Sequence, residues 1–169
     1  GNTTELEGEE GDVALSDGGG DRTGIGLPGR QLELLKYLHG KGRPVVLVLL
    51  SGSAVDLAEV EPYADAIVFA WYPGEQGGNA IADVLFGDYN PAGRLPVTFV
   101  KSMDQLPDFL DYGMRGRTYR FMEEEPLYRF GFGLSYTRFE YSNLKVSSFG
   151  VKVSGEVETS GNQSAASDP

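Results

Sequence analysis

The chain has 169 residues, of which 25 are acidic and 14 are basic, so its formal net charge is -11 at pH 7. It contains no cysteine and one histidine, His39, which excludes thiol nucleophiles, disulfides and zinc sites built on cysteine or on several histidines. The acidic excess argues against a nucleic-acid partner, and no apolar run is long enough to span a membrane. Carboxylates are therefore the side chains left for chemistry.

The first 26 residues are rich in Glu, Asp and Gly and show no amphipathic period, which predicts a long loop. One interpretation is a solvated acidic loop. The other is that one glutamate, with its pKa raised by neighbouring negative charges, acts as a general acid. Spacing alone leaves both interpretations open. The carboxylates concerned are Glu5, Glu7, Glu9, Glu10 and Asp12.

The next sixty residues show an alternation of helical and extended patterns. A helix is predicted over 28–39, with Pro28 in its first turn and Gly40 after its end. Residues Val45–Leu50 are apolar without alternation, which is typical of a parallel strand covered on both faces. We expect a short helix over 55–60, a second buried strand over 66–71 and a helix over 75–86. This order predicts an α/β fold, an open and mostly parallel sheet with helices on both faces.

The remaining residues predict extended segments and turns. Leu95–Phe99 is expected to be an edge strand, because Pro96 cannot donate to a sheet. The alternating Tyr128, Phe130, Phe132 and Tyr136 are expected to pack a closing strand against the sheet, in preference to forming an exposed binding platform. Residues 142–169 have alternating valines before a Ser, Ala and Gly tail, which indicates the start of a β-sandwich.

Two motifs that suggest other chemistry lack the necessary context. Gly24–Gly29 matches a dinucleotide fingerprint, but a loop precedes it where a strand is needed, so a glycine-rich entry to a helix is the better interpretation. The turn at Ser51–Ala54 lacks a complete nucleophile-elbow pattern, and His39 precedes it. We therefore expect Ser51 and Ser53 to cap a helix and His39 to end one.

Three stretches resemble one family. Residues Trp71–Phe99, with the sequence WYPGEQGGNAIADVLFGDYNPAGRLPVTF, closely resemble the C-terminal α/β domain of glycoside hydrolase family 3. Pro126–Thr137 resembles the closing segment of that domain, and Gly20–Arg22 with Leu27–Gly29 resembles its approach to a helix. The resemblance implies that residues 1–138 are this α/β sandwich domain, with its N-terminal part missing. It also implies that residues 139–169 begin an incomplete fibronectin-type-III-like domain.

The resemblance also implies a mechanism. Members are exo-acting retaining β-glucosidases and β-xylosidases, with an aspartate nucleophile on an N-terminal barrel and a glutamate acid/base on a loop of the α/β domain. In many members this glutamate opens an E-x-E motif before a D-R pair. Leu6–Glu9 resembles that opening, which makes Glu7 the expected acid/base and Glu9 the second choice. The insertion between Glu10 and Asp21 lengthens the usual spacing to the D-R pair.

The implied partners are a glycoside substrate and the barrel of the same polypeptide, with no nucleic acid, membrane, cofactor or metal ion. Arg115, Arg117 and Arg120 are close together in the sequence and could contact that barrel. The implied location is periplasmic or secreted, and the isolated chain is expected to be inactive. The alternative is a non-catalytic α/β binding module whose acidic loop meets a basic partner.

Overall fold

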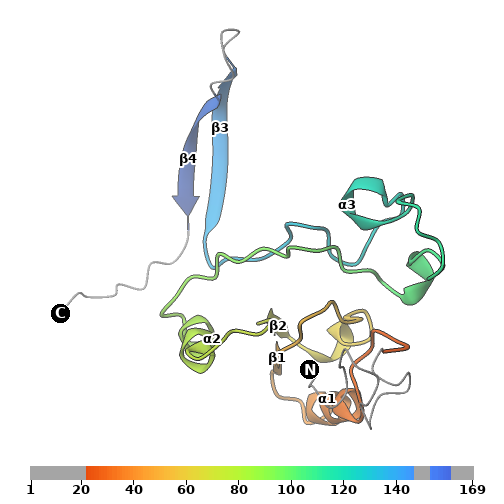
Figure 1. Cartoon of the computed structure of the whole chain (residues 1–169). Coiled ribbons are helices and arrows are strands. Elements are labelled where there is room, and N and C mark those ends of the chain that lie inside the picture. Colours follow the sequence, from red (N-terminus) through yellow and green to blue (C-terminus); the bar gives the residue numbers. More distant parts are fainter. Residues whose placement is uncertain (1–21, 147–152, 161–169) are drawn as a thin grey trace. The chain divides into compact units, whose positions relative to one another are not determined.

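The computed structural model describes residues 22–146 and 153–160. These residues divide into two units, and Figure 1 labels their helices and strands. The first unit contains the described residues up to Gly78 together with Leu95–Phe132. The second contains Asn79–Arg94 together with the described residues from Gly133 onward.

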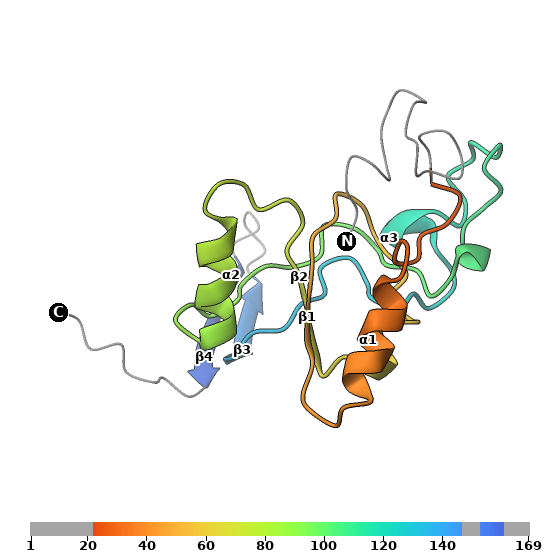
Figure 2. The same cartoon turned by 90° about the horizontal axis from the view of Figure 1, so that it is seen from below.

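The first unit is built on a short parallel sheet. Strands β1 (Val46–Leu49) and β2 (Ala66–Phe69) pair in parallel, with Val46 opposite Ala66 and Leu49 opposite Phe69. Helix α1 (Gln31–His39) lies alongside the sheet in Figure 2, and its Leu35 is buried in the same cluster as Leu49. The parallel pair and its helix confirm the predicted α/β class. A larger sheet with helices on both faces stays a prediction.

Helix α1 begins three residues later than predicted and ends at the predicted residue. Gly29 adopts a φ of +58°, a left-handed conformation that glycine tolerates, and the helix begins two residues later. This confirms the interpretation of the Gly24–Gly29 motif as a helix entry. His39 is the last helical residue, as predicted, and its ring meets the edge of Tyr63 at a centroid distance of 5.8 Å.

The helix predicted over 55–60 is wrong. Asp56 accepts a hydrogen bond from the backbone N–H of Ala58 at 2.9 Å, which forms a turn. A single 3₁₀ turn, η1 (Glu61–Tyr63), follows. The segment is too short to form a stable helix. The turn nevertheless buries its three apolar side chains, which are Val55, Leu57 and Val60.

The core of the first unit is centred on Phe99, which is fully buried. Its ring meets Phe69 at 5.1 Å and Tyr128 at 6.4 Å, in edge-on arrangements. The backbone N–H of Phe99 donates to the carbonyl of Tyr128 at 2.9 Å, in an isolated antiparallel bridge. The segment over 95–99 therefore pairs as an extended chain but forms only a bridge in place of the predicted edge strand, because Pro96 has no N–H to donate.

The prediction that all four alternating aromatic residues pack inward is wrong for three of them. Tyr128 packs against the core, whereas Phe130, Phe132 and Tyr136 are 42–55% exposed. A turn breaks the alternation, since the N–H of Phe132 bonds to the carbonyl of Arg129 at 3.0 Å and Gly131 has a φ of +83°. Phe132 instead stacks on the Tyr128 ring at 4.8 Å.

Two short helices lie in the part of the first unit between these paired segments. They are η2 (Met103–Gln105) and α3 (Thr118–Phe121), separated by a loop that contains no regular element. Ser102 caps η2 by accepting from the N–H of Asp104 at 3.3 Å. Tyr119 of α3 stacks on Phe130 at 4.5 Å, which ties this region to the closing segment.

Helix α2 (Gly77–Phe86) begins two residues later than predicted and leads into the second unit. There the Tyr136 hydroxyl donates to the carbonyl of Val84 at 2.6 Å, and Asn90 accepts from the N–H of Tyr136 at 2.8 Å. Strands β3 (Arg138–Val146) and β4 (Val153–Ser160) then form an antiparallel hairpin. The rest of the predicted β-sandwich stays a prediction.

Candidate functional site

The predicted acid/base Glu7 and its alternative Glu9 lie outside the described residues, as does Asp21. The structure describes the end of their loop. Arg22 donates from its guanidinium to the carbonyl of Gly26 at 2.9 Å. The carbonyl of Ile25 accepts from the N–H of Asp56 at 2.6 Å. The end of the acidic loop is therefore fixed beside the chain that leaves β1.

That chain and the one leaving β2 form the carboxyl edge of the parallel sheet, where α/β proteins commonly bind ligands. After β1, Ser51 is fully buried, and its hydroxyl donates to the carbonyl of Ser53 at 2.8 Å. This bond closes a tight turn that leads to no helix, so the predicted helix-capping role of Ser51 and Ser53 is wrong. The one histidine of the sequence, His39, meets the ring of Tyr63.

After β2, the backbone turns sharply at Trp71. This residue has a φ of +54°, a conformation that is strained for a bulky side chain and that clusters at functional sites. Its ring packs on Phe69 at 4.7 Å, so the indole belongs to the core and not to an exposed platform. The sequence signal for this turn is the Trp-Tyr-Pro run directly after an apolar strand.

Gly52 and Tyr72 bring the two chain segments into contact. A Cβ atom placed on Gly52 would lie 2.5 Å from Cε2 of Tyr72, closer than such atoms approach one another. The Tyr72 side chain is 63% exposed, so one face covers Gly52 and much of the ring remains accessible. The carboxyl edge thus presents a phenol beside a bare backbone.

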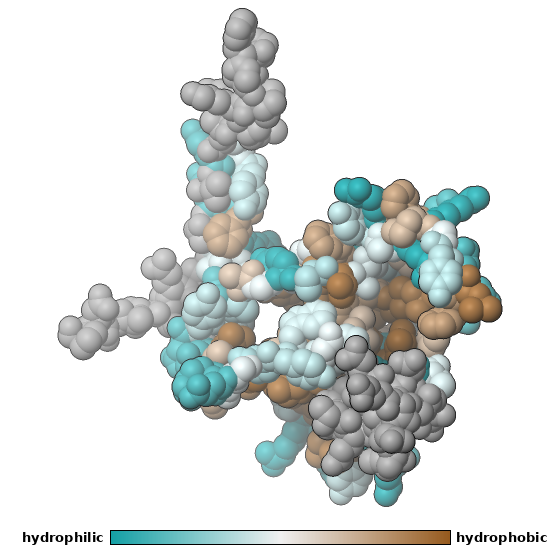
Figure 3. Space-filling model, viewed as in Figure 1, coloured by the Kyte–Doolittle hydropathy of each residue, from teal (hydrophilic) through white to brown (hydrophobic). Residues whose placement is uncertain are grey.

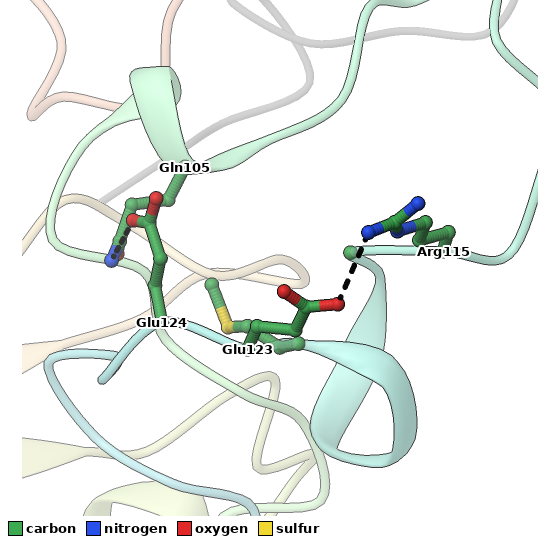
Figure 4. Close-up of a pocket in the computed structure, with 6 residues that line it drawn as sticks. Gln105, Arg115, Glu123 and Glu124 are labelled. Atoms are coloured by element: carbon green, nitrogen blue, oxygen red, sulfur yellow. Dashed lines mark hydrogen bonds and ion pairs between the residues drawn. The ribbon is translucent and has the colours of Figure 1, made fainter.

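A second place where polar side chains meet is an open hollow of about 190 Å³, shown in Figure 4. Arg115 lies 3.7 Å from a carboxylate oxygen of Glu123, and Gln105 donates to Glu124 at 3.1 Å. Nearby, the hydrogen bond from Arg129 lowers the pKa of the Glu125 carboxyl. These carboxylates are exposed and paired, so the hollow lacks the desolvated carboxyl group that an acid catalyst requires.

The predicted arginine cluster separates into three different environments. Arg115 pairs with Glu123, as described. Arg117 donates to three backbone carbonyls, those of Asp108, Asp111 and Gly113. Arg120 lies over the ring of Tyr119. Contact of these arginines with a barrel stays a prediction.

The surroundings of Tyr128 raise the pKa of its phenol. Its hydroxyl donates to the Glu61 carboxylate, which links the closing segment to η1. Burial, and then the hydrogen bond and charge of Glu61, raise the pKa of the phenol above its usual value of 10.0. A neutral phenol locked in this way is a structural link between two segments.

Among the residues that the structure describes, no three His, Asp or Glu side chains gather closely enough to hold a metal ion. In the same residues, no helix is both long enough and apolar enough to cross a membrane.

The chain is similar in sequence to proteins that are named as β-xylosidases and β-glucosidases. A xylan 1,4-β-xylosidase of Xylanibacter ruminicola is 56% identical over 142 residues, which cover 83% of this chain and 16% of that protein. A periplasmic β-glucosidase of Salmonella typhimurium is 43% identical over 82% of this chain and 20% of that protein. The chain therefore spans about a fifth of the length of these relatives.

Solved structures give the same result. The β-D-glucoside glucohydrolase of Trichoderma reesei superposes with a TM-score of 0.72 at 31% identity, over 82% of this chain and 21% of that one. A β-glucosidase of Kluyveromyces marxianus in complex with glucose gives 0.70 at 35% identity, over 86% and 19%. The profile of the glycosyl hydrolase family 3 C-terminal domain matches residues 1–136. The chain therefore belongs to the family of glycosyl hydrolase family 3 C-terminal domains.

Proposed function

We propose that this chain is part of an exo-acting retaining β-glycosidase that hydrolyses terminal β-D-glucosyl or β-D-xylosyl residues, and that it contributes the acid/base loop. The observation that carries the proposal is the family match over residues 1–136, a range that includes the acidic loop. The names of the relatives, a xylosidase and a glucosidase, support the class of substrate.

In this proposal Glu7 protonates the leaving oxygen and later activates water, while an aspartate on the N-terminal barrel attacks the anomeric carbon. A retaining mechanism needs these two carboxylates about 5 Å apart. The proposal gives Glu9, two residues further along the sequence, the role of a carboxylate that orders the loop or contacts the leaving-group side. The anchoring of Ile25 by Asp56 is consistent with a loop that ends at the carboxyl edge of the sheet.

The test is Glu7→Ala in the full-length enzyme, with Glu9→Ala and Glu10→Ala as matched controls. Glu7→Ala should greatly slow the hydrolysis of glycosides with poor leaving groups, which need protonation. Glycosides with good leaving groups should still form the glycosyl-enzyme, and added azide should restore turnover by replacing activated water. Azide rescue in Glu9→Ala or Glu10→Ala, with Glu7→Ala near normal, would show that another glutamate is the acid/base.

The alternative of a non-catalytic module makes a different prediction for the same experiment. In that case the full-length protein would hydrolyse neither aryl β-glucosides nor aryl β-xylosides, and no glutamate variant would change this. Comparing the two aryl glycosides as substrates also determines which sugar is preferred.

We also propose that the protein acts in the periplasm or outside the cell. The support is the name of the Salmonella typhimurium relative, a periplasmic β-glucosidase. Fractionation of the source cells, with the full-length protein detected by antibody, tests this location. Protein found only with cytoplasmic markers would contradict it.

A further inference from the structure

The C-terminal end of α1 and the turn after it carry positive charge in a chain that is otherwise strongly acidic. No Asp or Glu occurs between Glu33 and Asp56, although the whole chain has 25 acidic and only 14 basic residues. Lys36, Lys41 and Arg43 fall in this interval, and all three are exposed. Figure 3 shows hydrophilic side chains, coloured teal, that project from the end of the first unit where Figure 1 draws α1.

Two tyrosine rings lie next to these positive charges. Nζ of Lys41 lies 4.2 Å from the centre of the Tyr37 ring, and Nζ of Lys36 lies 5.2 Å from the centre of the Tyr63 ring. A cation–π contact holds an ammonium group in place without neutralising its charge. Tyr37 is 62% exposed, so much of its ring stays accessible beside the Lys41 ammonium. The end of α1 therefore presents a flat ring next to positioned positive charges.

The lysines and Arg43 have no acidic partner in the part of the chain that the structure describes. The ion pairs of the described residues involve three other cations, Arg30, Arg115 and Arg129. Two nearby carboxylates have partners of their own, since Glu33 accepts from Arg30 at 2.8 Å and Asp65 accepts from a backbone N–H at 2.7 Å. Within the described chain, these positive charges can therefore meet an external anion.

We propose that the basic surface of α1, formed by Lys36, Tyr37, Lys41 and Arg43, binds a polysaccharide that carries carboxylate groups, of the class of an acidic xylan. The lysines and the arginine donate charge-assisted hydrogen bonds to the carboxylates, and the Tyr37 ring lies against the apolar face of a sugar. The inference rests on the proposed function in one respect, namely that the protein acts on carbohydrates. The surface holds the enzyme on a polymer from which it removes terminal sugars.

The charge distribution favours a sparsely charged polymer over a nucleic acid. Duplex DNA carries one negative charge about every 1.7 Å along its axis, so a protein of net charge -11 repels it strongly. An acidic xylan bears carboxylates on only some of its sugars. At physiological ionic strength, exposed charges more than about 8 Å apart are largely screened from one another. An isolated carboxylate therefore experiences the nearby basic surface more than the distant acidic residues.

The test compares two forms of one polymer, a xylan that bears glucuronic acid and the same xylan with its carboxylic acids reduced to alcohols. Binding of the full-length enzyme to each immobilised form is measured in dilute buffer, and binding through the proposed active site is common to both forms. The acidic form should bind roughly ten-fold more tightly, because several exposed charge pairs form. Added salt should remove the difference. Equal binding of both forms in dilute buffer would overturn the proposal.

Charge reversal shows which residues are responsible. The test variant is Lys41→Glu with Arg43→Glu, and the matched control is Lys101→Glu with Arg138→Glu, which makes the same change in net charge at two exposed cations outside α1. The test variant should lose the preference for acidic xylan, and the control should keep it. Both should hydrolyse a neutral aryl glycoside at the rate of the unchanged enzyme. A preference that the test variant keeps, or that both variants lose equally, would overturn the proposal.

Hydroxyl-radical footprinting of the unmodified full-length enzyme keeps the test valid if a variant fails to fold. Acidic xylan should protect Tyr37 from oxidation and reduced xylan should not, with Tyr141, which is 79% exposed, as the internal control. Stronger protection of Tyr37 by anionic phospholipid vesicles or by DNA would overturn the proposal in favour of another polyanion. Protection by acidic xylan in a protein that hydrolyses no glycoside would support this surface and reject only the proposed function.

Discussion

Individual residues at the carboxyl edge show how tightly this part of the chain is specified. Trp71 keeps a left-handed backbone conformation although it is a bulky residue, because its ring is fixed against Phe69 and lies near Phe99. Gly52 is required for a different reason, since the ring of Tyr72 occupies the space where a Cβ would lie. Both constraints come from contacts with aromatic rings.

Replacing Gly52 by Ala should destabilise the full-length protein by about 1 kcal/mol, the low end of the cost of overpacking, because the new methyl group must displace the exposed ring of Tyr72. The effect depends on that ring. In a Tyr72→Ala background the same change should be nearly neutral, as unfolding in urea would show in a double-mutant cycle. An equal cost in both backgrounds would mean that the Gly52 backbone itself is the constraint.

Tyr128 should be among the last of the nine tyrosines to ionise, because burial and the nearby Glu61 carboxylate raise its pKa. The unfolded phenol ionises first, so this contribution to stability is complete below pH 10.0 and is lost as the pH rises toward the folded-state pKa. Ultraviolet titration should show a late phase that Tyr128→Phe removes. Tyr141→Phe, at an exposed position, should leave that phase in place.

At the scale of elements, the pattern of apolar residues predicts the parallel strands and the two longer helices correctly. It fails where a segment is short or turned. Residues 55–60 have enough apolar residues for a helix, but the Asp56 turn buries them without one. The alternation of aromatic residues from Tyr128 to Tyr136 predicts a strand, but the chain turns at Gly131.

The arrangement of the candidate site was less predictable from the sequence than the elements were. The contact between Gly52 and Tyr72 exists only because strands β1 and β2 pair. Glu7 stays a prediction, carried by the family resemblance.

The exposures of two phenylalanines in paired segments give a prediction at this scale. Phe99→Ala should cost about 3–5 kcal/mol, as expected for a fully buried ring. Phe132→Ala should cost only about 1 kcal/mol, because its ring is 42% exposed and is stacked on Tyr128 at the surface. Thermal unfolding of the two variants of the full-length protein measures the difference. A cost for Phe132→Ala as large as that for Phe99→Ala would show that a further segment of the protein covers the ring.

At the scale of the whole molecule, the chain should not work by itself. The 169 residues, expressed alone, should hydrolyse no aryl β-glucoside or β-xyloside, because the proposed mechanism needs a second carboxylate from the barrel. A sensitive fluorogenic assay, with the full-length enzyme as positive control, measures this. Activity of the isolated chain that disappears in a Glu7→Ala variant would contradict the two-domain mechanism.

The two-stranded sheet has a consequence for handling the protein. Within the described residues, β1 and β2 each have a neighbour on one side only, and their sequences, VLVL and AIVF, carry no charge. Such open edges are templates for strand pairing between copies. The net charge of -11 keeps copies apart at low ionic strength, and salt screens that repulsion. The isolated chain should therefore aggregate more as salt is added, which light scattering would detect, and it is best purified in dilute buffer.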